Sequence, residues 1–224
     1  QLGDNDSVTP LADKMVATPV DETNSGLTSA TTWFTQVVAG AAHTCALRTD
    51  GAVFCWGDNA SGQLGDNSTT DRLLPTGVNG LGSGSGVVAL SAGAQHTCAL
   101  KSNHEVVCWG KNDKGQLGNN SATDSAVPVI ALTAANSTAV ALSAGGSHTC
   151  AASFDGTVRC WGSGELGQLG DNKEVAVDGA ADDCDSAGGS TSYCSKTATL
   201  VNWTAGVTSN ATLRPKTCHK YSIP

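Results

Sequence analysis

One segment is written three times along this chain. It reads AGAAHTCALRTDGAVFCWGDNASGQLGDN at 39–67, AGAQHTCALKSNHEVVCWGKNDKGQLGNN at 92–120 and AGGSHTCAASFDGTVRCWGSGELGQLGDN at 144–172, so successive copies are offset by 53 and then 52 residues. Short apolar stretches and glycine-rich turns at this period, with no helical pattern, predict an array of small sheets, each burying a face against the next. The sequence therefore favours function on the surface of an array over function in one catalytic cleft.

Each copy predicts a strand ending in HTCAL, a tight turn, a second strand ending in CWG, and a Gly/Asn-rich loop to GQLG. A longer polar link follows, such as 66–78, and then an apolar strand, such as 86–93 or 139–146. Four short strands per unit is the count of a propeller blade. We expect an all-β chain of β-propeller blades, each of four antiparallel strands, with about three full blades and partial ones beside them. Such a set forms an incomplete ring or part of a larger or multi-chain one.

The predicted divisions of the chain follow from the copies. They are a tail of an incomplete blade at 1–36, blades at 37–88, 89–140 and 141–206, and a divergent segment at 207–224. The opening QLGDN repeats the end of the motif, which indicates that the numbering starts inside a repeat. The third blade carries an insertion at 177–197 without a counterpart in the other two. It is either a contact loop or a neutral loop, since long surface loops cost little free energy.

Nine cysteines form four pairs spaced by ten residues and one single residue: Cys45/Cys55, Cys98/Cys108, Cys150/Cys160, Cys184/Cys194 and Cys218. In the first and third repeats the midpoint of the pair is Asp-Gly, which suits a three-residue hairpin loop and places the two cysteines opposite each other. Disulfides are therefore favoured over the competing hypothesis, a metal site with His43, His96 and His148, because one residue between His and Cys is a poor ligand spacing. Cys218 is predicted to be a free thiol or an interchain bridge.

Disulfides imply an oxidising location, which means outside the cell, on its surface or in a periplasm. Seven N-x-S/T sequons fit either a glycosylated exterior or the chance product of a chain rich in Asn, Ser and Thr turns: Asn5, Asn59, Asn67, Asn119, Asn136, Asn202 and Asn210. The formal net charge is -8, from 12 Lys and Arg against 20 Asp and Glu, with no basic run. We therefore expect no nucleic-acid partner, and the lack of a long apolar run predicts no membrane span.

No catalytic group of residues stands out from the repeats. His43, His96 and His148 share one context, which favours a scaffold role, because catalysis ordinarily breaks the symmetry of a repeat. Trp56, Trp109 and Trp161 occur once per blade in CWG, where packing between blades is expected. The loops around Asp58, Asp66 and Asp171 lack the ligand pattern of a calcium loop and indicate turns. We therefore expect no enzyme activity, no cofactor and no metal.

The combined pattern AGxxHTCAL, DGxVxCWG and GQLGxN, strong over about 37–172, resembles the regulator of chromosome condensation repeat family. The resemblance implies a propeller, typically of seven blades, more than an activity, because this fold serves unrelated tasks. The founding member is a nuclear nucleotide-exchange factor for a small GTPase. The cysteine pairs and the acidic composition of this chain are unlike those expected of a nuclear protein. The GWRHT context of plant ultraviolet receptors is absent. The disulfide-bearing repeats look most like those of bacterial surface and extracellular proteins.

Two functions follow as hypotheses. The first is a non-enzymatic extracellular or cell-surface module that binds other protein chains, of the same or a different kind, through loop faces or open blade edges, alone or as a subunit of a larger assembly. The alternative is a secreted inhibitor or ligand of an extracellular enzyme, which requires an aromatic-rich loop face. Aromatic residues make up 4 % of the chain.

Overall fold

The computed structural model of this 224-residue chain describes residues 33–171 and 194–201. All regular elements in these ranges are strands, and they form three antiparallel sheets of four. The first sheet contains β1 (Phe34–Ala39), β2 (His43–Arg48), β3 (Val53–Gly57) and β4 (Arg72–Gly77). The second contains β5 (Val87–Ala92), β6 (His96–Lys101), β7 (Val106–Gly110) and β8 (Ser125–Leu132). The third contains β9 (Ala139–Ala144), β10 (His148–Ser153), β11 (Val158–Ser163) and β12 (Cys194–Leu200). The predicted fold class is confirmed.

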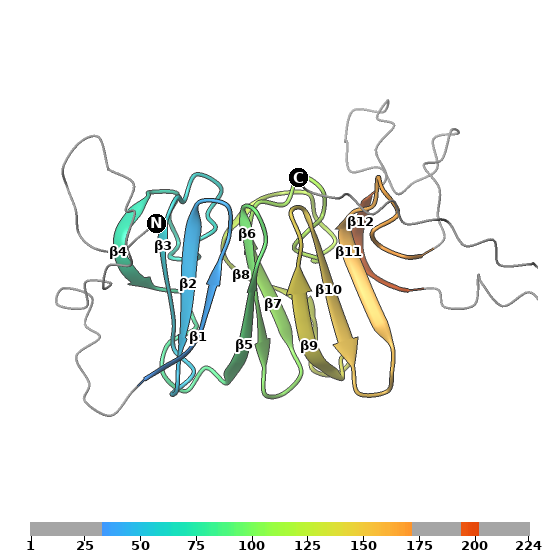
Figure 1. Cartoon of the computed structure of the whole chain (residues 1–224), viewed down its shortest axis with the longest axis horizontal. Coiled ribbons are helices and arrows are strands. Elements are labelled where there is room, and N and C mark those ends of the chain that lie inside the picture. The colour runs from blue at the N-terminus through green and yellow to red at the C-terminus, as the bar shows by residue number, and fades with distance from the viewer. Residues whose placement is uncertain (1–32, 172–193, 202–224) are drawn as a thin grey trace, which may run out of the picture.

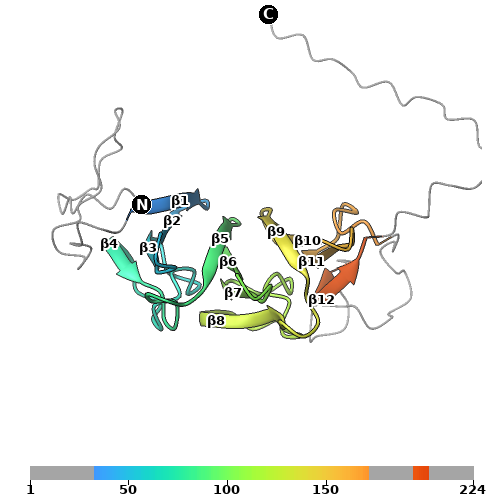
Figure 2. The ribbon, with the colours of Figure 1, turned by 90° about the horizontal axis from the view of Figure 1, so that it is seen from below.

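The three sheets stand side by side as blades of an open arc (Figure 1). Figure 2, a view along the blades, shows β1, β5 and β9 on the inner side of the arc and β4, β8 and β12 on the outer side. Pro75 in β4 and Pro128 in β8 fit this order, because proline lacks the N–H that a central strand needs and is tolerated in an edge strand.

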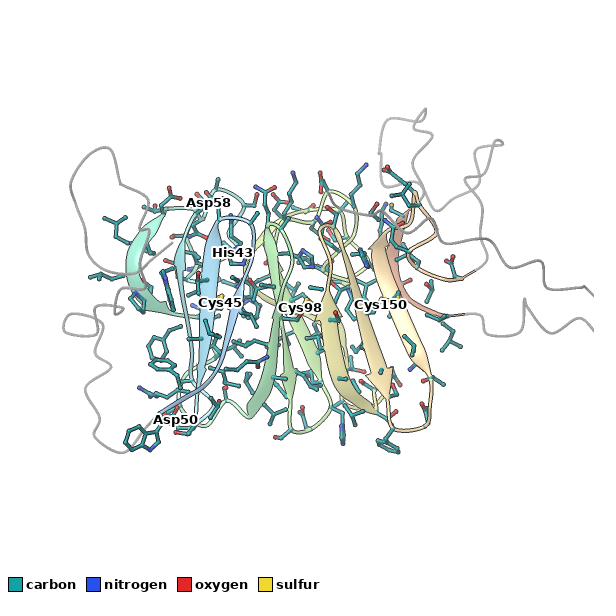
Figure 3. The ribbon with its side chains drawn as sticks, viewed as in Figure 1. His43, Cys45, Asp50, Asp58, Cys98 and Cys150 are labelled. Carbon is teal, nitrogen blue, oxygen red and sulfur yellow. A yellow bond between two sulfur atoms is a disulfide. The ribbon has the colours of Figure 1, made fainter. Side chains whose placement is uncertain are left out.

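The cysteine hairpins fold about the predicted midpoints. Cys45 lies opposite Cys55 in the β2–β3 ladder, and the two form a disulfide with their Cα atoms 4.1 Å apart. Cys98–Cys108 and Cys150–Cys160 repeat this bridge in the second and third blades, and Figure 3 shows the three at one height. The turn in the first blade is a three-residue loop whose last residue, Gly51, has φ +85°, a value that glycine adopts at little cost.

Two sequence predictions about strands need correction. The polar link at 66–78 contains the outer strand β4, whose alternation is hidden by its proline and its partly exposed position at the sheet edge. The apolar strand at 86–93 opens the second blade and does not close the first, because β5 pairs with β6. The predicted insertion at 177–197 is also too long: residues 194–197 belong to β12, which pairs with β11.

The hydrophobic core lies between blades. Leu47, Val53 and Leu64 of the first blade are in one cluster with Leu90 and Trp109 of the second, and a second cluster joins the second blade to the third in the same way. Each blade therefore supplies half of a core that the next blade completes. In the part of the chain described, no helix has the length and apolarity needed to cross a membrane.

Candidate functional site

The contact between the first and second blades, called here the first seam, centres on the backbone carbonyl of Gln63. This carbonyl accepts the indole N–H of Trp109 at 2.9 Å and the hydroxyl of Thr97 at 3.1 Å. Because Thr97 gives its only hydrogen to Gln63, its oxygen accepts from Nε2 of His43, 2.8 Å away. Four residues from three parts of the repeat motif thus form one buried network across two blades.

The second seam repeats the network with the same chemistry. Trp161 donates to the carbonyl of Gln116 at 2.9 Å, Thr149 donates to the same oxygen at 3.2 Å, and His96 Nε2 lies 2.9 Å from the Thr149 hydroxyl. Thr97, Thr149 and both indoles are buried. The motif letters H, T, W and Q therefore mark contacts between successive blades.

Burial controls the charge of the seam histidines. Removal from water lowers the pKa of His43 to about 4, although the negative charge of Asp58 acts in the opposite direction. Burial also lowers the pKa of His96 to about 4, and the nearby His43 and His148 add to this effect. Both rings are therefore neutral at physiological pH. The geometry agrees with the predicted scaffold role of His43 and His96. Each ring bonds to a threonine of the next blade and not to a turn.

The loops between CWG and GQLG are held by their own side chains. The buried amide of Asn59 donates to the Asp66 carboxylate at 3.1 Å and to the carbonyl of Thr70 at 3.0 Å, and accepts from the Leu64 N–H. Asp66 also forms an ion pair with Arg72 at 2.7 Å. Asp58 and Asp66 thus serve turns, as the sequence predicts, while Asp171 is at the end of a described range.

These loops also reach the following blade. The N–H of Asn67 donates to the carbonyl of Ala126 at the start of β8, and Asn120 makes the same contact with Lys196 in β12. Lys114 forms an ion pair with Glu165 of the third blade at 3.4 Å. Both of these described loops therefore cover the outer strand of the next blade.

The third blade presents the side that would receive a following blade. Its equivalents of the seam residues are His148, Gln168 and Gly170, and Leu166, at the position of Lys114, is 93 % exposed. We call this surface, formed by His148, Leu166, Gln168 and Gly170, the end face. His148 is half-buried, whereas His43 and His96 are buried. Cys150 is likewise partly exposed, and the cysteines of the first two bridges are fully buried.

A second surface is formed by the hairpin turns, at the end of the blades opposite Asp58, where Figure 3 shows Asp50. Trp33, 69 % exposed, lies beside the first turn, and Phe154, 66 % exposed, is in the third. His104 occupies the glycine position of the second turn with φ +70°, stacks edge-on against Phe154 and contacts the carbonyl of Ala139 at 2.9 Å. This hairpin-turn face carries exposed aromatic side chains, at its first and third turns, that the repeat motif does not predict.

Some of the remaining predicted residues lie within the described ranges and others lie outside them. Cys194 is buried at the start of β12, but Cys184 and Cys218 lie outside the described residues, so their states stay predictions. Within 33–171 and 194–201, no group of three His, Cys, Asp or Glu side chains is arranged to hold a metal ion. The zinc alternative fails for the first three cysteine pairs, because these sulfurs are bonded to each other.

The sequon asparagines also differ in their exposure to solvent. Asn59 is fully buried and its amide nitrogen is hydrogen bonded, so the folded chain does not expose this sequon. Asn67 and Asn136 are exposed, and Asn119 is half-buried and accepts from Asn112. Asn5, Asn202 and Asn210 lie outside the described residues.

Comparison with known proteins shows which family these repeats belong to. A profile described as the regulator of chromosome condensation (RCC1) repeat matches residues 50–100 and 103–152. A second profile of the same description matches 34–63, 87–116 and 139–168, which begin near the first strand of each blade. The chain belongs to the RCC1 repeat family. The motif residues of the seams lie within these matched segments, so the seams belong to the RCC1 repeat itself.

Several RCC1-repeat proteins resemble this chain in sequence. The ultraviolet-B receptor UVR8 of Arabidopsis thaliana is 37 % identical over 137 residues, which cover 60 % of this chain and 30 % of the receptor. The probable E3 ubiquitin-protein ligase HERC3 of Homo sapiens is 39 % identical over 136 residues, covering 60 % of this chain and 13 % of the ligase. This chain thus spans less than a third of the length of either relative.

Solved propellers match the fold. Yeast RCC1 (Prp20), in a crystal structure bound to Kap60, superposes with a TM-score of 0.64 at 24 % identity, covering 78 % of this chain and 38 % of that protein. Human WBSCR16 superposes with a TM-score of 0.60 at 21 % identity, covering 78 % of this chain and 40 % of WBSCR16. At this identity the likeness concerns the RCC1 propeller fold.

Proposed function

We propose that this RCC1-repeat chain is a non-enzymatic extracellular or cell-surface module that binds other protein chains. The observation that carries the proposal is the use of the repeated polar residues inside the seams. His43, Thr97 and Gln63 satisfy one another, and the same holds in the second seam. These polar side chains are therefore used to hold the blades together. Other proteins would be recognised by the end face and the loop surfaces.

The end face supports binding by blade addition. It presents the carbonyl of Gln168, the ring of His148 and the small Gly170. The equivalent groups in the seams contact a threonine hydroxyl and a tryptophan indole of the next blade. Exposed Leu166 adds an apolar contact. Yeast RCC1 is itself seen bound to Kap60, which fits a binding role for this fold.

The extracellular part of the proposal depends on the three disulfides, which persist in oxidising compartments. Trapping of thiols with an alkylating reagent in intact cells, before lysis, tests it. We expect Cys45 to Cys160 to remain unlabelled and the protein to appear in the medium, periplasm or surface fraction. Alkylated cysteines in a cytosolic fraction would contradict the proposed location.

Native mass spectrometry of the protein purified from its own source tests the binding role. We expect particles heavier than one chain, and Leu166→Asp on the end face should reduce them by at least about tenfold, because a negative charge replaces an apolar contact where the equivalent Lys114 pairs with a carboxylate. Leu200→Asp, which adds the same charge at an exposed site of β12, is the matched control and should leave them intact. A single chain without partners would refute the binding role.

One observation favours the second candidate, a secreted inhibitor or ligand of an enzyme. The hairpin-turn face carries Trp33 and Phe154 as highly exposed aromatic side chains, and such residues are enriched at binding hot spots. Loss of binding with Phe154→Ala but not with Leu166→Asp would select this candidate over blade addition.

A further inference from the structure

Each seam contains a histidine ring with one nitrogen in a hydrogen bond and the other without a partner. His43 and His96 are 1 % and 0 % exposed. Nε2 carries the hydrogen that Thr97 or Thr149 accepts, so Nδ1 of each neutral ring is a bare acceptor. Neither Nδ1 atom has a hydrogen-bond partner in the part of the chain described. Buried polar atoms of this kind are rare and call for a reason.

The glycine of AGxxH explains how the ring fits. The Cε1–Nδ1 edge of His43 packs against Gly40, where a Cβ would come 2.5 Å from Nδ1 and 2.6 Å from the Gly93 carbonyl. Gly93 and His96 repeat the arrangement, with a Cβ position 2.4 Å from Nδ1. A proton added to Nδ1 therefore meets a close-packed glycine backbone in place of water. Neutral histidine fits this site and charged histidine does not.

Few charged groups act on these rings. Among the described residues, the carboxylate of Asp58 favours the charged form of His43, but it is already held by the Gln63 amide at 2.6 Å. In the second blade Lys111 stands at the position of Asp58. The groups that act on His96 are His43 and His148, which oppose its protonation when they are themselves protonated. Neither seam therefore has an uncommitted carboxylate, among the residues described, that would stabilise a charged ring.

We propose that the two seams form an acid-sensitive device: protonation of His43 and His96 separates the blades, while each disulfide-closed hairpin stays folded. The hairpins keep their structure because backbone hydrogen bonds and bridges such as Cys45–Cys55 hold them, whereas the titrating ring of His43 bonds to Thr97 of the next blade. The interactions that break are those of the seam, namely the hydrogen bonds from the indoles of Trp109 and Trp161 to the glutamine carbonyls. The device follows from the seam geometry and does not depend on the proposed binding role.

The size of the effect follows from proton linkage. A ring with a pKa of about 4 in the closed seam and an ordinary value of 6.5 in the open one binds its proton preferentially when open. Between pH 7 and pH 3 the equilibrium for opening rises by about 200-fold per histidine. The change takes place mostly between pH 6 and pH 4.

Hydrogen exchange of the ¹⁵N-labelled full chain, with its disulfides intact, tests the proposal. From pH 6 to pH 3.5, we expect the protection factors of the Trp109 and Trp161 indole N–H groups, corrected for intrinsic exchange, to fall at least about tenfold more than those of the β2–β3 ladder amides. Indoles that stay protected at pH 3.5 would overturn the proposal. Loss of indole and ladder protection together would overturn it as well, since that is ordinary acid unfolding.

A pair of variants locates the effect. In His96→Gln the amide still reaches Thr149 but does not titrate, so Trp161 protection should become independent of pH while Trp109 keeps its transition. His148→Gln, at the half-buried end face, is the matched control and should leave both transitions in place. Equal behaviour of the two variants would contradict the assignment.

Should His96→Gln not fold, the imidazole ¹⁵N shifts of the unmodified chain decide the matter. We expect His43 and His96 to be Nε2–H tautomers at pH 6 and to titrate together with the loss of indole protection. An Nδ1–H tautomer, or titration of either ring near pH 6.5 with the indoles still protected, would refute the device.

Discussion

Gly65 of the first blade lies directly against the indole ring of Trp109 in the second: a Cβ on Gly65 would stand 2.8 Å from both Cδ1 and Nε1 of that ring. Gly118 and Trp161 repeat this contact in the next seam. The last glycine of GQLG thus clears space for the tryptophan of the following CWG. These two motif elements, from different repeats, meet as one packing unit.

Gly65→Ala should therefore destabilise the chain by about 3 kcal/mol, because a methyl group is forced against the indole at φ +70°. Gly80→Ala is the control, since Gly80 has a similar φ of +72° but nothing within 4 Å of its Cβ position. It should cost about 1 kcal/mol, the backbone term alone. Urea unfolding measures both, and equal losses would show that the indole contact contributes nothing.

Thr97→Val should cost about 1–3 kcal/mol, since it keeps the shape but leaves the Nε2–H of His43 without its buried acceptor. Thr76→Val on the outer strand β4, where the hydroxyl is half-buried and bonds locally to the Leu74 carbonyl, should stay within about 0.5 kcal/mol of the unmodified chain. Thermal and urea unfolding of the two variants compare them. A Thr97→Val chain as stable as its control would speak against the seam network.

Asn59→Gln should destabilise by about 2–4 kcal/mol, because the longer side chain cannot keep the buried contacts to Asp66, Thr70 and Leu64 together. Asn136→Gln, at an exposed sequon without a left-handed φ, should change stability by less than about 0.5 kcal/mol. The melting temperatures of the two variants measure this difference. A loss at Asn136 equal to that at Asn59 would contradict the described loop.

Limited reduction should open Cys150–Cys160 before the other two described bridges. Cys150 is partly exposed at the end face, whereas Cys45, Cys55, Cys98 and Cys108 are covered by the following blade. Alkylation after brief treatment with a phosphine reductant, followed by peptide mapping, gives the order. Simultaneous loss of all three would indicate that reduction requires global unfolding.

Global stability should fall with acidification. The pKa of His43 and of His96 is about 4 when folded and ordinarily 6.5, so the unfolded chain binds the proton first. Their contribution is complete above pH 6.5 and is lost as the pH falls through 4, about 3 kcal/mol for each ring. Urea midpoints at pH 7 and pH 4, in the unmodified chain and in His43→Gln/His96→Gln, measure it. An equally steep pH dependence in the double variant would contradict this origin.

Local rules are sufficient for several elements of the fold. The ten-residue spacing around Asp50 and Gly51 predicts the hairpin, its left-handed glycine and the bridge across it, because a short antiparallel ladder leaves only one register. The burial of Trp109 and Trp161 is likewise expected from one tryptophan per repeat. Strand β4 is not predicted, because an edge strand with a proline and one exposed face lacks a clear apolar pattern.

The repeated letters alone determined the period, the antiparallel hairpins and their cysteine pairs, since these depend on residues close together in the chain. Only the tertiary structure decided what the histidine, threonine and glutamine of the motif do. Their partners lie 33 to 54 residues away, as with Thr97 on Gln63 and His43 on Thr97, so no local pattern names them. The physical reason is that a blade cannot bury its own face: the polar groups left on that face are satisfied only when the next blade packs against it.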